Sequence, residues 1–128
     1  MPGEFGGFLQ VSGLSYEVDA TIASGCVEDE NGMMSGIEGA RRVSHVLVGG
    51  EPLDPAGTYT VAGSDYLLTG HGDGMTAFDG CTMLAEQIGV DNQVLIEYIT
   101  VTLGGEIGGD YADPYGQGRI VIHDGREE

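Results

Sequence analysis

Glycine residues punctuate this chain from end to end. The 24 glycines run from Gly3 to Gly125 in a sequence of 128 residues, and they follow no fixed period. Glycine adopts positive φ angles without steric cost, so this distribution favours many tight turns and excludes a collagen-like repeat. At this length one domain covering residues 1–128 is expected. The sequence therefore predicts a loop-rich β or α+β domain.

Apolar and β-branched residues predict five or six short strands between these turns. Several segments alternate apolar and polar side chains or are rich in β-forming residues. The predicted strands cover 8–18 with a bend at Ser12-Gly13, 42–48 ending in a hairpin turn at Gly49-Gly50, 58–68, and 119–123. A hairpin turn at Gly49-Gly50 favours antiparallel pairing, and we expect a mostly antiparallel or mixed sheet.

One segment shows helical periodicity instead. Residues 91–103 carry apolar side chains at helical spacing, with Asp91 as an N-cap and Gly104-Gly105 as a stop. Residues 23–41 mix four glycines with acidic residues and predict a long surface loop or insertion, while 124–128 predict a frayed tail. The fold class is therefore α+β (mixed α/β), with one main helix.

The charge balance limits the partners. The chain has 21 acidic and 4 basic residues, for a formal net charge of -17. Such a charge repels phosphate backbones, so nucleic acid is not an expected partner. An acidic surface is more often an adaptation to solubility, salt or an extracellular setting than a cation-binding surface. No apolar run is long enough for a membrane span, and the start at Met1 lacks the pattern of a signal peptide.

The cysteines and histidines predict no metal site. Cys26 and Cys81 lack the spacing of a zinc site, and the sequence leaves open whether they pair. His45, His71 and His123 are far apart and form no HxH or HxxxH pair. The chain also has no nucleophile elbow, Walker loop or dinucleotide-binding glycine pattern, so we assign it no catalytic residue.

Three segments in a fixed order carry a more specific signal. They are Gly6-Gly7-Phe8-Leu9-Gln10-Val11-Ser12-Gly13-Leu14 with the later Gly50-Glu51-Pro52-Leu53-Asp54-Pro55, then Asp65-Tyr66-Leu67-Leu68-Thr69-Gly70-His71-Gly72-Asp73-Gly74, and finally Gly118-Arg119-Ile120. Together they resemble the second half of the C-terminal, substrate-binding domain of the 5'-nucleotidase family. That family includes UDP-sugar hydrolases and 2',3'-cyclic-nucleotide phosphodiesterases.

The resemblance implies a layered C-terminal domain within a two-domain hydrolase. The complete two-domain protein, called the parent here, would hold two divalent metal ions in an N-terminal metallophosphatase domain. Its C-terminal domain would bind the nucleotide or nucleoside. This chain would supply no metal ligands and no cofactor, so we expect it to be inactive alone. The resemblance also implies an extracellular, cell-wall-associated or periplasmic parent.

The second segment carries the site residues that the resemblance implies. Tyr66 would stack on the base, Asp73 would bind the ribose hydroxyls, and Gly72 and Gly74 would shape the turn between them. The residues alone favour a core aromatic at a strand end for Tyr66, and the family motif reverses that preference. For Asp73 the residues alone favour a turn-capping aspartate, a role that is compatible with ribose binding. His71 is an extra residue in this glycine turn and is expected to affect the distance between Asp73 and Tyr66.

Other interpretations of the chain's function stay open. The chain is also compatible with a non-catalytic surface or interaction module that keeps the fold, or with the C-terminal domain of a related UDP-sugar hydrolase or cyclic-nucleotide phosphodiesterase. Because a sheet cut within a domain leaves an unpaired edge and apolar surface, we expect a homodimer or a swapped oligomer.

Overall fold

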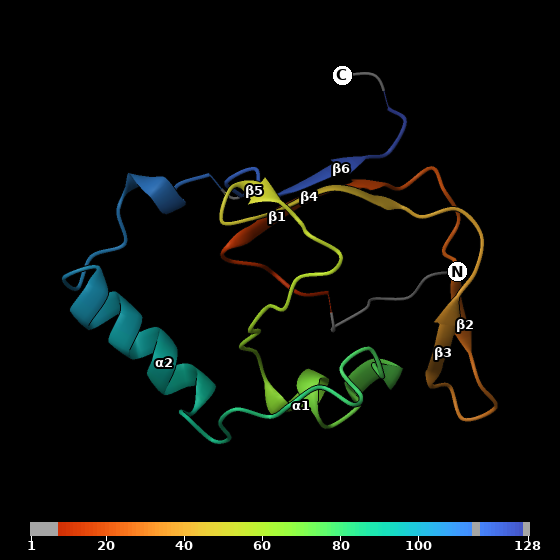
Figure 1. Cartoon of the computed structure of the whole chain (residues 1–128). Coiled ribbons are helices and arrows are strands. Elements are labelled where there is room, and N and C mark those ends of the chain that lie inside the picture. The colour runs from red at the N-terminus through yellow and green to blue at the C-terminus, as the bar shows by residue number, and fades with distance from the viewer. Residues whose placement is uncertain (1–7, 114–115, 127–128) are drawn as a thin grey trace. The chain divides into compact units, whose positions relative to one another are not determined.

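The computed structural model describes residues 8–113 and 116–126 (Figure 1). It divides into two compact units, one built from the residues up to 79 together with those from 118 onward, and the other from residues 80–117. Strands dominate the first unit and one helix dominates the second, which confirms the α+β class. Gly6 and Gly7 of the first motif, the tail residues 127–128 and Pro114 lie outside the described residues.

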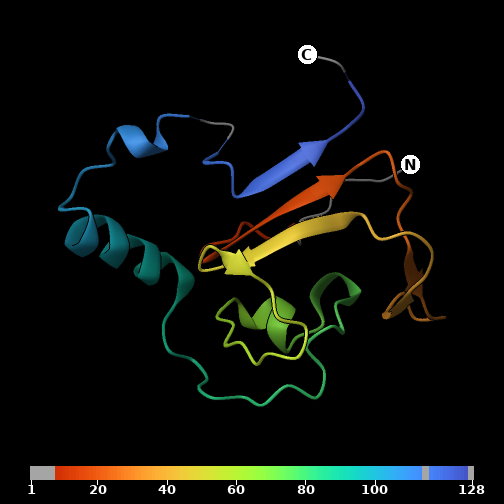
Figure 2. The same ribbon diagram turned by 45° about the horizontal axis from the view of Figure 1, so that its top comes forward.

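A four-stranded mixed sheet forms the centre of the first unit. The strands are β1 (Leu14–Asp19), β4 (Val43–Val48), β5 (Glu51–Pro52) and β6 (Ile120–His123), in the order β5-β4-β1-β6. The pairs β1–β4 and β4–β5 are antiparallel, whereas β6 lies parallel to β1 (Figure 2). The prediction of a mixed sheet is therefore confirmed.

The β4–β5 hairpin turns at the two glycines that the sequence marked. Gly49 and Gly50 have φ angles of 61° and 88°, and the N–H of Gly49 donates to the carbonyl of Gly13 at 2.8 Å. A left-handed conformation at both positions matches the twist of the two strands it joins. The segment after the turn is the short strand β5.

One face of the sheet carries a cross-strand cluster around Glu17. Its carboxylate lies 2.9 Å from Nε2 of His123 on β6 and 3.4 Å from Nδ1 of His45 on β4. The pairing of β1 with β4 contains a bulge here, because Ser15 pairs with Leu47 but Glu17 pairs with Ser44, which leaves one extra residue in β4. His45 lies in this bulge and adopts a φ angle of 49°. The hydrogen bond with His123, then the charge of His45, lowers the pKa of Glu17.

The segment 23–41, which the sequence predicted to be a long surface loop or insertion, contains a hairpin. Strands β2 (Cys26–Glu28) and β3 (Met34–Ile37) pair antiparallel as a separate two-stranded sheet. The carboxylate of Asp29 accepts hydrogen bonds from the N–H groups of Asn31 and Met33 at 2.8 and 2.9 Å, which lower its pKa. These strands are too short to show an alternating pattern, so the turn-forming residues dominated the prediction.

The strand predicted over residues 58–68 is wrong. Residues 58–64 form no regular element, and the chain then enters the short helix α1 (Asp65–Leu68). Leu67, within α1, is 5% exposed, and among the described residues it is the one apolar side chain that is buried. Because β propensities differ by only about 1 kcal/mol, the burial of one leucine is enough to override them. The strand predicted from residue 8 is also shorter, since β1 begins at Leu14.

The unit 80–117 holds the predicted helix. Helix α2 (Asp91–Glu97) continues as the π-helical turn η2 (Tyr98–Thr102) and stops before Gly104 and Gly105. Asp91 is the first helical residue, so the capping position belongs to Val90. The apolar side chains of this segment are largely exposed, among them Val94, Leu95, Ile96 and Val101. Self-association through such surface stays a prediction.

Candidate functional site

Helix α1 and the turn that follows it form the candidate site in the first unit. The turn contains the 3-10 segment η1 (Gly72–Gly74), closed by hydrogen bonds from Gly74 N–H to the His71 carbonyl at 3.0 Å and from Met75 N–H to the Gly72 carbonyl at 3.1 Å. His71 and Asp73 adopt φ angles of 54° and 52°. Left-handed conformations are uncommon for residues with a Cβ atom, and here the side chains of both residues make hydrogen-bonding contacts.

Tyr66 and Asp73 meet across this turn. The Tyr66 hydroxyl donates to Oδ1 of Asp73 at 3.2 Å, and 55% of Tyr66 is exposed. Tyr66 lies in helix α1 and not at a strand end, so the alternative of a core aromatic is wrong. The extra residue His71 does not separate the two candidate residues. One carboxylate oxygen of Asp73 is engaged by Tyr66, and the other remains available as an acceptor.

Gly72 is required by the position of the Tyr66 ring. Gly72 is buried, and a Cβ atom at this position would lie 2.2 Å from Cε1 and 2.4 Å from Cζ of Tyr66. Real Cβ atoms do not approach other atoms so closely, and an aromatic ring cannot shift as a flexible chain end does. The glycine therefore lets one edge of the ring lie directly against the turn.

Gly74 is required by the β2–β3 hairpin. It has a φ angle of 73°, and a Cβ atom there would lie 2.4 Å from the carbonyl oxygen of Gly32, in the hairpin turn. Nearby, the Thr76 hydroxyl donates to the carbonyl of Met34 on β3. The hairpin thus supports the site turn from a segment 42 residues away in sequence, which no local pattern predicts.

His71 makes a side-chain contact of its own. Its Nε2 atom lies 2.7 Å from Oδ1 of Asp79, and the two side chains are 43% and 59% exposed. The sequence singled out His71 only as a departure from the family pattern. Asp79 was not singled out at all, because no motif marks it.

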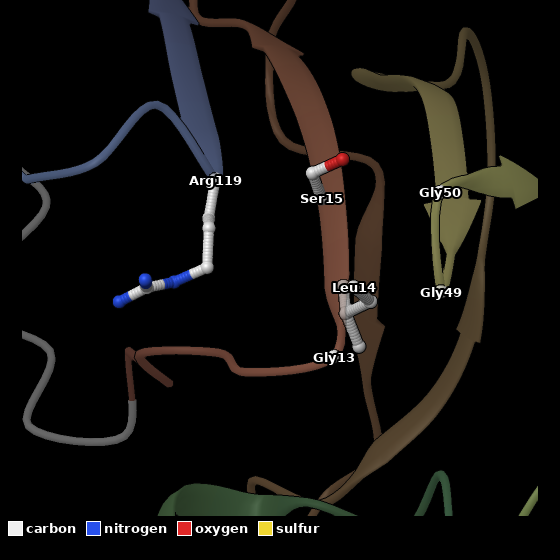
Figure 3. Close-up of a pocket in the computed structure, with 6 residues that line it drawn as sticks. All are labelled: Gly13, Leu14, Ser15, Gly49, Gly50 and Arg119. Atoms are coloured by element: carbon white, nitrogen blue, oxygen red, sulfur yellow. The ribbon is translucent and has the colours of Figure 1, made fainter.

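A separate shallow hollow of about 310 Å³ lies over the start of β1 (Figure 3). It is lined by Gly13, Leu14, Ser15, Gly49, Gly50 and Arg119. In Figure 3 the Arg119 side chain extends from the start of β6, on the side of β1 opposite Gly49 and Gly50. Arg119 belongs to the third motif, but none of the lining residues belongs to the turn that carries Asp73.

The histidines and cysteines that the sequence offered as possible metal ligands have other surroundings in the structure. Each histidine lies beside a carboxylate, and residues 8–113 and 116–126 contain no group of three or more His, Cys, Asp or Glu side chains that fits a metal ion. Cys26 and Cys81 are free and exposed. No helix in the described part of the chain combines the length and hydropathy needed to cross a bilayer.

The fold and the turn define a mixed α+β domain with an aromatic residue and a carboxylate joined beside a glycine turn. The family model of the 5'-nucleotidase C-terminal domain matches residues 2–80, and the chain belongs to this family. The match includes the first two motifs and the site turn, whereas the Gly118-Arg119-Ile120 motif lies beyond it. Proteins with this domain are generally extracellular or periplasmic. Comparisons with curated proteins and with solved structures give no match.

Proposed function

We propose that this chain is the nucleoside-binding part of a metal-dependent phosphoesterase of the 5'-nucleotidase type. The observation that carries the proposal is the contact between Tyr66 and Asp73 across the Gly72 turn. It joins an exposed aromatic ring and a carboxylate, which are the two groups needed to hold a base and a ribose. The family membership supports the same assignment.

The chemistry of the two side chains fits the two parts of a nucleoside. An exposed aromatic ring stacks on any nucleobase, with about 1–3 kcal/mol per base. A carboxylate accepts hydrogen bonds from two vicinal hydroxyls, and the Tyr66 hydroxyl fixes the rotation of the Asp73 carboxylate. Tyr66 and Asp73 would therefore bind and orient the nucleoside, which lowers the entropic cost of aligning a phosphate ester for attack.

The reaction itself is assigned to another part of the parent protein. Two divalent metal ions in an N-terminal metallophosphatase domain would supply the activated water for hydrolysis of the phosphate ester. We place that parent outside the cytoplasm, in an extracellular, cell-wall-associated or periplasmic setting, where it would degrade nucleotides. The chain alone is then expected to release no phosphate from AMP.

The direct test is a calorimetric titration of the chain with adenosine, compared with the Tyr66→Ala variant. Loss of base stacking is expected to weaken binding by about 1–3 kcal/mol, or roughly five- to 150-fold. Tyr59→Ala is the matched control, because Tyr59 is 43% exposed and its hydroxyl accepts a hydrogen bond from the Asp54 N–H at 2.9 Å, away from the site turn. Equal binding by wild type and Tyr66→Ala, or no binding by either, would contradict the proposal.

A non-catalytic interaction module is the second candidate. It is favoured by the large apolar side chains along α2, since Val94, Leu95 and Ile96 are 56%, 59% and 48% exposed. The adenosine titration separates the two functions, since a module that has lost its pocket gives no heat with adenosine. A related UDP-sugar hydrolase or cyclic-nucleotide phosphodiesterase would instead bind the nucleoside of its own substrate and differ in the phosphate ester that the parent cleaves.

A further inference from the structure

His71 begins the site turn in a left-handed conformation, and its side chain contacts a second residue of the same segment. Its φ angle of 54° places it in the left-handed region, and its imidazole lies 2.7 Å from the Asp79 carboxylate. This contact joins two residues eight positions apart, one before Asp73 and one after it. The segment that carries Asp73 is therefore closed into a loop by a side-chain contact.

Asp79 is itself held by the backbone. Its N–H donates to the carbonyl of Thr76 at 3.0 Å, and the Thr76 hydroxyl donates to the carbonyl of Met34 on β3. The contact of His71 thus leads to a segment that is attached to the β2–β3 hairpin. Gly74, between the two ends, lies against Gly32 of the same hairpin.

We infer that the His71–Asp79 pair is a clamp that positions Asp73 for the ribose of a bound nucleoside. The inference rests on the proposed function and assigns a positioning role to two residues other than the proposed ligand contacts, Tyr66 and Asp73. Asp73 adopts a left-handed φ angle of 52° two residues after His71, within the clamped loop, and its carboxylate accepts a hydrogen bond from the Tyr66 hydroxyl. When the clamp is released, the loop gains freedom to relax toward ordinary φ angles, and the carboxylate loses its alignment with the ribose hydroxyls.

The test uses the variant His71→Asn in the full chain. Asparagine tolerates the left-handed conformation, but its shorter side chain does not reach Asp79. The matched control is His45→Asn, because His45 has a φ angle of 49° and lies 3.4 Å from a carboxylate, on the sheet instead of the turn. Both variants are titrated with adenosine and with 2',3'-dideoxyadenosine, which keeps the base and lacks the vicinal hydroxyls.

We expect His71→Asn to weaken adenosine binding roughly two- to fivefold, the range for a partly exposed ion pair, and to leave 2',3'-dideoxyadenosine binding unchanged. His45→Asn should change neither. A fall in affinity for both ligands alike would indicate general damage to the site and would overturn the clamp. So would an effect of His45→Asn as large as that of His71→Asn.

A double-mutant cycle with Asp79→Ala checks that the two residues act through each other. The double variant should bind adenosine no more weakly than either single variant, whereas additive losses would contradict a shared contact. Amide hydrogen exchange at Gly74 and Met75, whose N–H groups close the turn, is measured without any ligand. Faster exchange in His71→Asn than in His45→Asn is expected, and unchanged exchange rejects the clamp. If wild type binds no adenosine, the proposed function fails while this exchange measurement still decides whether the pair holds the turn.

Discussion

Two turns of this protein use left-handed residues in contrasting ways. The turn between β4 and β5 uses Gly49 and Gly50, and a Cβ atom at either position would have no neighbour within 4 Å. The site turn uses His71 and Asp73 at similar φ angles, and its glycines lie against other atoms. The first turn needs backbone freedom alone. The second needs both space and side-chain partners, which is typical of a turn that has to hold a functional group.

The largest effect is expected from a substitution at a glycine that is needed for its small size and not for its φ angle. Gly72→Ala would place a Cβ atom 2.2 Å from the Tyr66 ring, although the φ angle of Gly72 is ordinary. We expect overpacking to cost about 1–3 kcal/mol of unfolding free energy and adenosine affinity to fall by more than about tenfold. Urea denaturation and calorimetric titration measure the two quantities.

Gly50→Ala supplies the opposite case. Its Cβ atom has open space, but its φ angle of 88° is unfavourable for alanine, so a loss of about 1–2 kcal/mol in stability is expected with adenosine affinity unchanged. If Gly72→Ala and Gly50→Ala affected binding alike, the distinction between the two turns would be wrong.

A smaller effect is expected from removing one oxygen atom at the site. Tyr66→Phe keeps the ring against Gly72 and removes the hydroxyl that donates to Asp73 at 3.2 Å. A hydrogen bond of this kind contributes about 0.5–1.5 kcal/mol, so adenosine binding should weaken by roughly two- to tenfold. Binding of 2',3'-dideoxyadenosine should not change, because it has no vicinal hydroxyls for Asp73. Tighter adenosine binding by the variant would show that the Tyr66 hydroxyl competes with the ribose.

The sequence correctly predicted those elements of the fold that depend on a local pattern of residues. Gly49-Gly50 between two β-forming segments indicated a hairpin, and the periodicity from Asp91 indicated a helix, because both signals lie within a few residues. The resemblance placed Tyr66 and Asp73 in one site, and the structure brings them into contact. The pairing of β6 with β1 and the support of Gly74 by Gly32 arise from contacts between distant segments, which no local pattern encodes.

The errors have a common physical origin. Residues 58–68 contain β-forming side chains, but the burial of Leu67 favours a helical turn there. Residues 23–41 contain turn formers, but three hydrogen-bonded pairs are enough for a hairpin. In both segments the intrinsic preferences are weak, so tertiary contacts determine the structure.

The smallest expected effect concerns the other left-handed histidine with a carboxylate partner, His45, which with His123 flanks Glu17 on the sheet. Hydrogen bonding to His123 is the main cause that lowers the pKa of Glu17 from its usual value of 4.5. The folded protein therefore releases this proton more readily than the unfolded chain does. The resulting stabilisation is complete above the unfolded pKa and is lost as the pH falls through the folded pKa.

Glu17→Gln should accordingly lower stability slightly at pH 6 and make the difference from wild type vanish well below pH 4.5, the usual pKa of this carboxyl. Urea denaturation of both proteins at a series of pH values measures this convergence. Adenosine affinity should be unaffected, because Glu17 contacts the sheet histidines and not the site turn. Coincident stability curves for the two proteins would mean that the Glu17 contacts contribute nothing, and parallel curves with an offset would mean that its ionisation does not. A histidine and carboxylate pair would then matter in the site turn alone.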